Sequence, residues 1–196
     1  MLNLASLSSL VLAVSAQSFS FSYALNISAT PSLWDGHCTY PVASRTFNLT
    51  SYLGRWYQVA GTLTPFTASC TCVYAQYTAN ANGTVNVFNS CQVGNSSVNI
   101  EGTATPADPI YGEAGALRVQ FPVSGAPACP GPNYIVQHAT SNWAIVQASN
   151  FSSLFLLSRV QNPVRADLDF WLHRAGTLGS NLAKVVLTNQ TGCLFT

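Results

Sequence analysis

Side chains that could perform acid–base, metal or nucleophilic chemistry are few and widely separated. The carboxylates are Asp35, Glu101, Asp108, Glu113, Asp167 and Asp169. None of them forms a pair placed to share the roles of general acid and general base. His37, His138 and His173 fall in an N-terminal arm, at a strand end and in a helix, which indicates neither a zinc triad nor a histidine-activated nucleophile. No glycine-rich phosphate loop is present. The sequence predicts a binding protein without metal or cofactor, not an enzyme.

The first residues resemble a secretory signal peptide. An apolar run from Leu4 to Val14 ends in Val14-Ser15-Ala16, and these small side chains suit a signal peptidase. The run is too short to span a bilayer, and no other segment is long enough. We expect residues 1–16 to be removed and the protein to be extracellular. Because that compartment is oxidising, the even number of cysteines, 6, predicts disulfides.

Charge is scarce in this chain. Only 7% of the 196 residues are charged, against roughly 25% in typical soluble domains. The formal net charge of +1 favours neither nucleic acid nor an anionic membrane surface as a partner. Six Asn-x-Ser/Thr sequons begin at Asn26, Asn48, Asn82, Asn95, Asn150 and Asn189. We therefore expect a secreted glycoprotein whose glycans keep it soluble.

Short strand-like runs alternate with turn signals through most of the chain. The expected strands are 54–63, 72–79, 84–92, 98–105, 115–122, 133–139, 143–148 and 154–159. Asn80-Ala81-Asn82-Gly83 is typical of a hairpin turn, because glycine after asparagine supplies positive φ angles. We predict an all-β domain over residues 38–196, preceded by a partly ordered arm over residues 17–37. Eight strands in meander order predict an antiparallel up-and-down barrel, which closes on itself.

After the eighth strand the apolar period changes to that of a helix. Asn162-Pro163 can serve as cap and first helical position, and Gly176 can end the helix. The residues expected on its apolar face are Val164, Leu168, Trp171, Leu172 and Ala175. One C-terminal α-helix should therefore pack on the outside of the barrel, followed by a short strand from Val185 to Leu187.

Several stretches, in order along the chain, resemble the lipocalin family, particularly its group of apolipoprotein D and bacterial lipocalins. They are Gly54-Arg55-Trp56-Tyr57, Cys72-Val73-Tyr74-Ala75-Gln76-Tyr77, Ile100-Glu101-Gly102-Thr103-Ala104-Thr105-Pro106, Leu156-Leu157-Ser158-Arg159 and Thr188-Asn189-Gln190-Thr191-Gly192-Cys193. The resemblance implies a tight backbone at Gly54 and a Trp56 that plugs the narrow end of the barrel. It also implies that Arg159 stacks on Trp56 as a cation–π lid.

The resemblance also bears on the cysteines. It implies a Cys72–Cys193 bridge and places Cys38 as the family's N-terminal cysteine, but the usual partner of that cysteine is missing. Cys129, in a loop expected at the same end, is its predicted partner. Cys70 and Cys91 then remain, although strand alternation places them on opposite faces if Tyr77 pairs with Val85. Either a bulge allows a Cys70–Cys91 bridge, or Cys91 is a thiol in the pocket.

Alternation and the match to the family select the side chains expected to face the interior and contact a ligand. They are Tyr77, Asn89, Phe121, Tyr134 and Phe155. Aromatic walls with a few hydrogen-bonding groups suit a small hydrophobic ligand such as a fatty acid, lysolipid, sterol or pigment. The leading hypothesis is a secreted carrier of such a molecule, with no receptor indicated. One alternative is a surface glycoprotein whose barrel is packed shut. Another is a thiol-dependent isomerase that uses a free Cys91.

Overall fold

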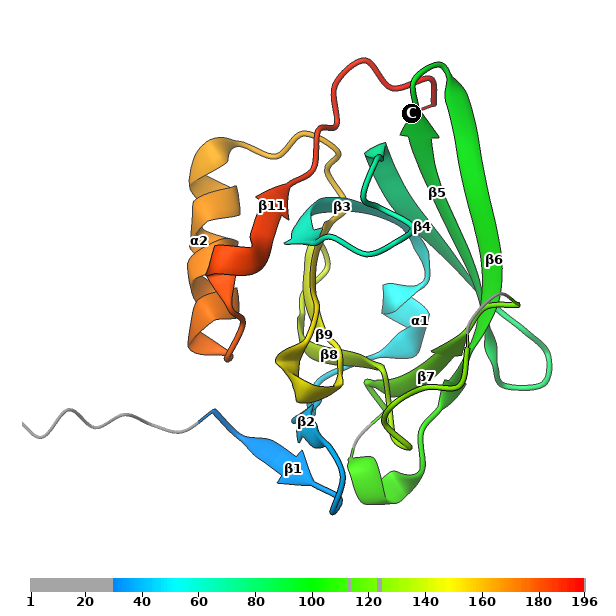
Figure 1. The fold of residues 1–196 in the computed structure, drawn as a ribbon, viewed down its shortest axis with the longest axis vertical. Helices are drawn as coiled ribbons and strands as arrows, with labels where there is room; N and C mark the ends of the chain where they lie inside the picture. The colour runs from blue at the N-terminus through cyan, green and yellow to red at the C-terminus, as the bar shows by residue number, and fades with distance from the viewer. Residues whose placement is uncertain (1–29, 113, 123–124, 196) are drawn as a thin grey trace, which may run out of the picture.

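The computed structural model describes residues 30–112, 114–122 and 125–195, and within them eight antiparallel strands form a closed barrel (Figure 1). The barrel strands are β3 (Gly54–Thr62), β4 (Thr71–Ala79), β5 (Val85–Val93), β6 (Ser96–Pro106), β7 (Ala116–Gln120), β8 (Tyr134–Ala139), β9 (Trp143–Gln147) and β10 (Leu154–Ser158). Each pairs with the next along the chain, and β10 returns to β3. The predicted up-and-down barrel is confirmed.

The turn between β4 and β5 sets the pairing of these two strands. Gly83 takes a φ of +82°, as the predicted hairpin turn requires, and the last pair before the turn joins Ala79 to Val85. Tyr77 consequently lies opposite Val87, so the expected pairing with Val85 is wrong by two residues. A shift of two residues leaves every side chain on its expected face, because the strand period is two.

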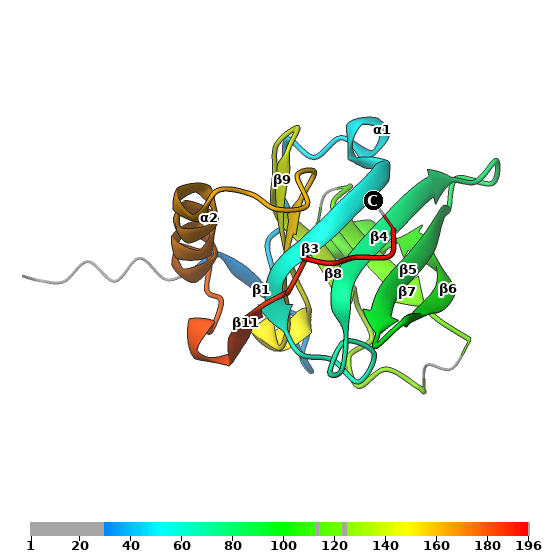
Figure 2. The same ribbon diagram turned by 90° about the horizontal axis from the view of Figure 1, so that it is seen from above.

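One amphipathic helix, α2 (Arg165–Thr177), lies outside the barrel, as Figure 2 shows from above. Leu168 and Ala175 are buried there in one apolar cluster with Trp143 and Ile145 of β9. Val164 precedes the helix and is exposed, so its predicted place on the apolar face is wrong.

Both predicted ends of this helix need correction. Asn162 does not cap it, because its side-chain amide donates to the Gln190 carbonyl (3.3 Å), and the helix begins at Arg165. Gly176 lies inside the helix. The chain leaves the helix at Gly179, whose φ of +96° is the left-handed conformation that glycine adopts readily after a helix end.

Short elements surround the barrel. They are β1 (Ser32–Trp34), β2 (Thr39–Pro41), α1 (Leu49–Tyr52), β11 (Val185–Leu187) and the 3-10 turns η1 (Pro109–Tyr111), η2 (Ser149–Phe151) and η3 (Leu182–Lys184). β1 and β2 form a hairpin, so the end of the predicted N-terminal arm has regular structure, and β11 pairs with β3. The expected signal peptide, most of the arm and Asn26 lie outside the described residues. Among the helices of the described part, none is long and apolar enough to cross a membrane.

Candidate functional site

One end of the barrel is closed by Trp56, from the first barrel strand, and Arg159, which directly follows the last. The Trp56 side chain is fully buried, and its Nε1 donates to the Tyr52 carbonyl (2.7 Å). The Arg159 guanidinium lies 3.8 Å from the centroid of the Trp56 ring. Gly54 takes a φ of +92°, and a Cβ atom there would lie 3.3 Å from the Arg159 guanidinium. The structure thus brings Gly54, Trp56 and Arg159 together.

Arg159 also donates hydrogen bonds to the backbone segment that leads into the first barrel strand. Its guanidinium donates to the carbonyls of Ser51 (3.0 Å), Tyr52 (3.1 Å), Leu53 (2.7 Å) and Arg55 (2.5 Å). These carbonyls lie at the end of α1 and the start of β3, where neither helix nor sheet supplies all the partners. Partial burial lowers the pKa of the Arg159 side chain, but arginine keeps its charge in proteins.

A cavity of about 560 Å³ occupies the barrel interior. All five side chains predicted to contact a ligand line it. They come from β4, β5, the residue directly after β7, β8 and β10: Tyr77, Asn89, Phe121, Tyr134 and Phe155. No charged side chain belongs to the lining within the described residues. The barrel is therefore not filled by its own side chains.

Other lining residues were missed by reasoning from the sequence. Gln58 and Ile100 share the inward alternation of their strands, so this pattern could have identified them. The segment from Thr64 to Thr67, in the loop after β3, also lines the cavity. A loop has no alternation to indicate which side chains turn inward. β3 runs from Trp56 to this loop, so the loop lies at the end opposite the plug.

A disulfide between Cys70 and Cys91 ties this loop to β5 (S–S 2.00 Å). The pairing of β4 with β5 shifts between Thr71 and Tyr74, and Cys72 takes a φ of +54° within that stretch. This irregularity changes the alternation, as the bulge alternative required. Cys91 is bonded rather than free, so the structure does not contain the pocket thiol that the isomerase hypothesis needs.

The C-terminal tail is attached to β4 beside that bulge. Cys72 is fully buried and bonded to Cys193, and its backbone N–H donates to the Asn189 carbonyl (2.7 Å). The buried Gln190 side chain donates to the carbonyls of Gln58 (3.0 Å) and Val73 (2.8 Å). The tail therefore supplies hydrogen bonds to strands that line the cavity.

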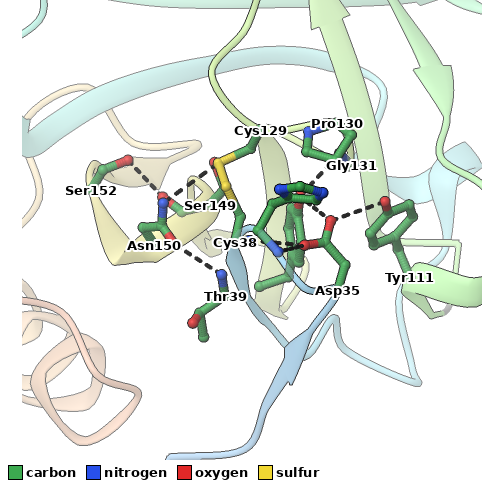
Figure 3. Close-up of a disulfide and its surroundings, with 12 residues drawn as sticks. Asp35, Cys38, Thr39, Tyr111, Cys129, Pro130, Gly131, Ser149, Asn150 and Ser152 are labelled. Atoms are coloured by element: carbon green, nitrogen blue, oxygen red, sulfur yellow. Dashed lines mark hydrogen bonds between the residues drawn. A yellow bond between two sulfur atoms is a disulfide. The ribbon is translucent and has the colours of Figure 1, made fainter.

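The third disulfide, Cys38–Cys129, fixes the β1–β2 hairpin to the loop between β7 and β8 (Figure 3). Asp35 accepts hydrogen bonds from the Tyr40 (2.8 Å) and Tyr111 (3.1 Å) hydroxyls. Burial acts to raise the pKa of Asp35, but these bonds and two from backbone N–H groups outweigh it and lower the pKa to about 2. The hairpin is held by polar contacts as well as by the bridge.

Asn150, one of the predicted glycosylation sites, lies against the same disulfide. Its Oδ1 accepts from the Thr39 N–H (2.8 Å), and its Nδ2, the atom that would carry a glycan, donates to Cys129 Sγ (3.4 Å). Within the part of the chain that the structure describes, Asn48, Asn82 and Asn189 engage only Oδ1, as an acceptor from a residue two or three positions later. Asn95 lies in the exposed turn between β5 and β6.

We expect Asn150 to carry less glycan than Asn48 when the chain is made in a secretory pathway, because a glycan at Asn150 Nδ2 competes with hairpin docking. The measurement is site-by-site occupancy, from deglycosylation in ¹⁸O-labelled water followed by peptide mass spectrometry. Asn48 is the matched control, since its Nδ2 has no partner among the described residues. Equal occupancy at the two sites would contradict the expectation.

Metal ligands are not grouped in the part of the chain that the structure describes. Within it, no set of three or more His, Cys, Asp and Glu side chains is placed to hold a metal ion. His138 packs against Trp171 of α2, with ring centroids 5.3 Å apart, and lies outside the barrel cavity. The site therefore consists of a cavity with aromatic walls and a few hydroxyl and amide groups.

A closed eight-stranded barrel around an apolar cavity defines a class of proteins built to enclose a small molecule. Residues 47–190 match the family model of the lipocalin-like domain, and the chain belongs to the lipocalin family. Apolipoprotein D of Cavia porcellus is 27% identical over 165 residues, which cover 81% of this chain and 85% of that one. Apolipoprotein D of Bos taurus is 34% identical over 87 residues, 44% of each chain. These relatives place the chain in the apolipoprotein D-like group.

Solved structures agree on the fold. Lobster apocrustacyanin A1 superimposes with a TM-score of 0.58 at 22% sequence identity, over 74% of this chain and 81% of that chain. Insecticyanin from the tobacco hornworm Manduca sexta gives a TM-score of 0.54 at 19% identity, over 76% of this chain and 82% of that chain.

Proposed function

We propose that this lipocalin binds a small hydrophobic molecule in its barrel and carries it outside the cell. The observation that supports the proposal is the cavity of about 560 Å³, lined by aromatic and aliphatic side chains with a few hydroxyl and amide groups. Its volume lies in the range typical of small-molecule sites. Burial of apolar ligand surface supplies about 25 cal/mol per Å² before the costs of association. A fatty acid tail, a lysolipid, a sterol or a pigment suits these walls.

Extracellular carriage is supported by independent features of the chain. Residues 1–16 resemble a signal peptide, and sequons recur through the sequence. Three disulfides join all six cysteines, which is typical of proteins from oxidising compartments. The open cavity argues against the alternative of a surface glycoprotein with a packed barrel.

Native mass spectrometry of the secreted, deglycosylated protein tests the proposal directly. We expect a co-purifying apolar molecule, which organic extraction then identifies. An empty protein should bind the neutral fluorescent probe N-phenyl-1-naphthylamine with enhanced emission. Absence of any bound molecule, together with no binding of this probe or of lipids from several classes, would overturn the proposal.

We expect Asn89→Trp to weaken binding of N-phenyl-1-naphthylamine by at least about tenfold, because an indole at this position on β5 occupies the cavity. The measurement is a fluorescence titration of the folded variant and of the unaltered protein. Asn99→Trp on the neighbouring strand β6 is the matched control, since Asn99 is exposed and does not line the cavity. Equal affinities for the two variants would show that the probe binds elsewhere.

A further inference from the structure

Three tyrosine hydroxyls form a short chain at the plugged end of the barrel. The Tyr134 hydroxyl lies 2.6 Å from that of Tyr52 and 2.8 Å from that of Tyr77. Tyr52 comes from α1 and packs on Trp56, with ring centroids 5.1 Å apart. Tyr77 and Tyr134 line the cavity, whereas Tyr52 does not. The chain of hydroxyls thus runs from the plug into the wall of the ligand site.

The three hydroxyls carry one more hydrogen than their two mutual hydrogen bonds use. Each hydroxyl has one hydrogen to donate, and the two O···O contacts use two of the three hydrogens. No other partner for these hydroxyls exists among the described residues. One O–H group is therefore left without an acceptor, and both Tyr77 and Tyr134 can present it to the cavity. When a ligand fills the cavity and displaces water from this end, a donor without an acceptor costs free energy, so an acceptor oxygen on the ligand is favoured there.

Among the described residues, no charged side chain lines this end of the cavity. Burial raises the pKa of Tyr77 to about 12 and holds those of Tyr52 and Tyr134 well above the usual value, so all three remain neutral. Arg159 does not line the cavity, and its guanidinium contacts the Trp56 ring and backbone carbonyls. An ionised carboxylate placed here would lose its hydration without forming an ion pair with a side chain of the cavity lining.

We propose that the ligand enters with a neutral acceptor oxygen, a carbonyl or a hydroxyl, at its inner end, and that this oxygen accepts the hydrogen bond left over from the tyrosine chain. The inference rests on the proposed function and specifies the chemical class of the ligand and its orientation in the barrel. An amphiphile with a charged head group should bind in the opposite sense, with its apolar tail at the tyrosines and its head at the solvent end.

Three probes that share a hydrocarbon chain test this orientation: undecan-2-one, undecane and undecanoate. Each is titrated as a competitor of N-phenyl-1-naphthylamine into the whole protein and into Tyr77→Phe/Tyr134→Phe, which has no cavity hydroxyl left at this end. We expect the double variant to bind undecan-2-one about tenfold more weakly, the usual effect of losing a buried hydrogen bond. Its affinities for undecane and undecanoate should change by less than about twofold. Tyr57→Phe on β3, at a residue that does not line this cavity, is the matched control and should change none of them.

Infrared spectroscopy of undecan-2-one labelled with ¹³C at the carbonyl provides a second measurement that needs no variant. Bound to the unaltered protein, its C=O stretch should lie below its frequency in hexane, as expected for a hydrogen-bonded carbonyl. A frequency equal to that in hexane would overturn the inference, as would equal losses of affinity for all three probes in the double variant. If the unaltered protein carries no co-purifying molecule and binds neither N-phenyl-1-naphthylamine nor any of the three probes, the proposed function itself fails. If undecane binds and the ketone signature is absent, only the orientation is wrong.

Discussion

Replacing both Cys72 and Cys193 with serine is expected to lower the free energy of unfolding by about 5 kcal/mol, the largest effect of any bridge in the molecule. The two cysteines are separated by 121 residues, and a cross-link that closes a longer loop removes more entropy from the unfolded chain. The tail would also lose its fixed position, and with it the buried hydrogen bonds from Gln190 to β3 and β4. Denaturant unfolding under non-reducing conditions, followed by tryptophan fluorescence, measures the change.

The Cys70–Cys91 bridge is the internal comparison for this prediction. It closes a loop of only 21 residues, so its removal should cost about 3 kcal/mol. That variant should also release N-phenyl-1-naphthylamine faster, because the loop carrying the segment from Thr64 to Thr67 lines the cavity and is tied to β5 by this bridge. Equal losses of stability for the two variants would contradict the loop-length argument.

Arg159→Ala is expected to lower the free energy of unfolding by about 3 kcal/mol, because the guanidinium serves four backbone carbonyls and the face of Trp56. Without it, carbonyls at the junction of α1 and β3 lose a charged donor and Trp56 loses its cover. A shift of the intrinsic fluorescence to longer wavelength should accompany the loss, since water gains access to the indole. Denaturant unfolding and the emission spectrum are the two measurements.

Two further variants distinguish the hydrogen bonding and stacking of the Arg159 guanidinium from the effect of its positive charge. Arg159→Lys keeps the positive charge but has a single ammonium group, which cannot reach the same set of carbonyls, so it should restore less than half of the lost stability. Arg165→Ala removes an exposed arginine whose ion pair with Asp169 (2.8 Å) lies on the surface of α2, and should cost about 0.5 kcal/mol or less. A loss for Arg165→Ala as large as that for Arg159→Ala would refute the assigned role.

Much of the barrel follows from local patterns in the sequence. Alternating side chains bounded by turn residues locate all eight strands to within two residues, because burial of one face of a strand imposes a period of two. Alternation, together with the match to the family, selects Tyr77, Asn89 and Phe155, which lie on the wall of the cavity. Errors occur where the pattern is interrupted, as at the ends of α2, where Asn162 makes a tertiary hydrogen bond instead of a helix cap.

Other features depend on contacts between residues far apart in the chain. The bulge near Cys72 decides that Cys70 and Cys91 can bond, and it is coupled to a tail more than a hundred residues away. Asn150 has the sequence of a glycosylation site, yet its amide packs against the Cys38–Cys129 bridge. Neither outcome leaves a trace in local periodicity.

The sequence alone determined the fold class and an apolar interior, because these depend on residue type and spacing along each strand. The plug at Trp56 was implied by the resemblance to the lipocalin family. Only the tertiary structure decided that the interior is open and that Tyr52, Tyr77 and Tyr134 share two hydrogen bonds at its inner end. The physical reason is barrel closure. It brings a helical turn and two separate strands to within hydrogen-bonding distance, and the number of donors left over depends on that geometry.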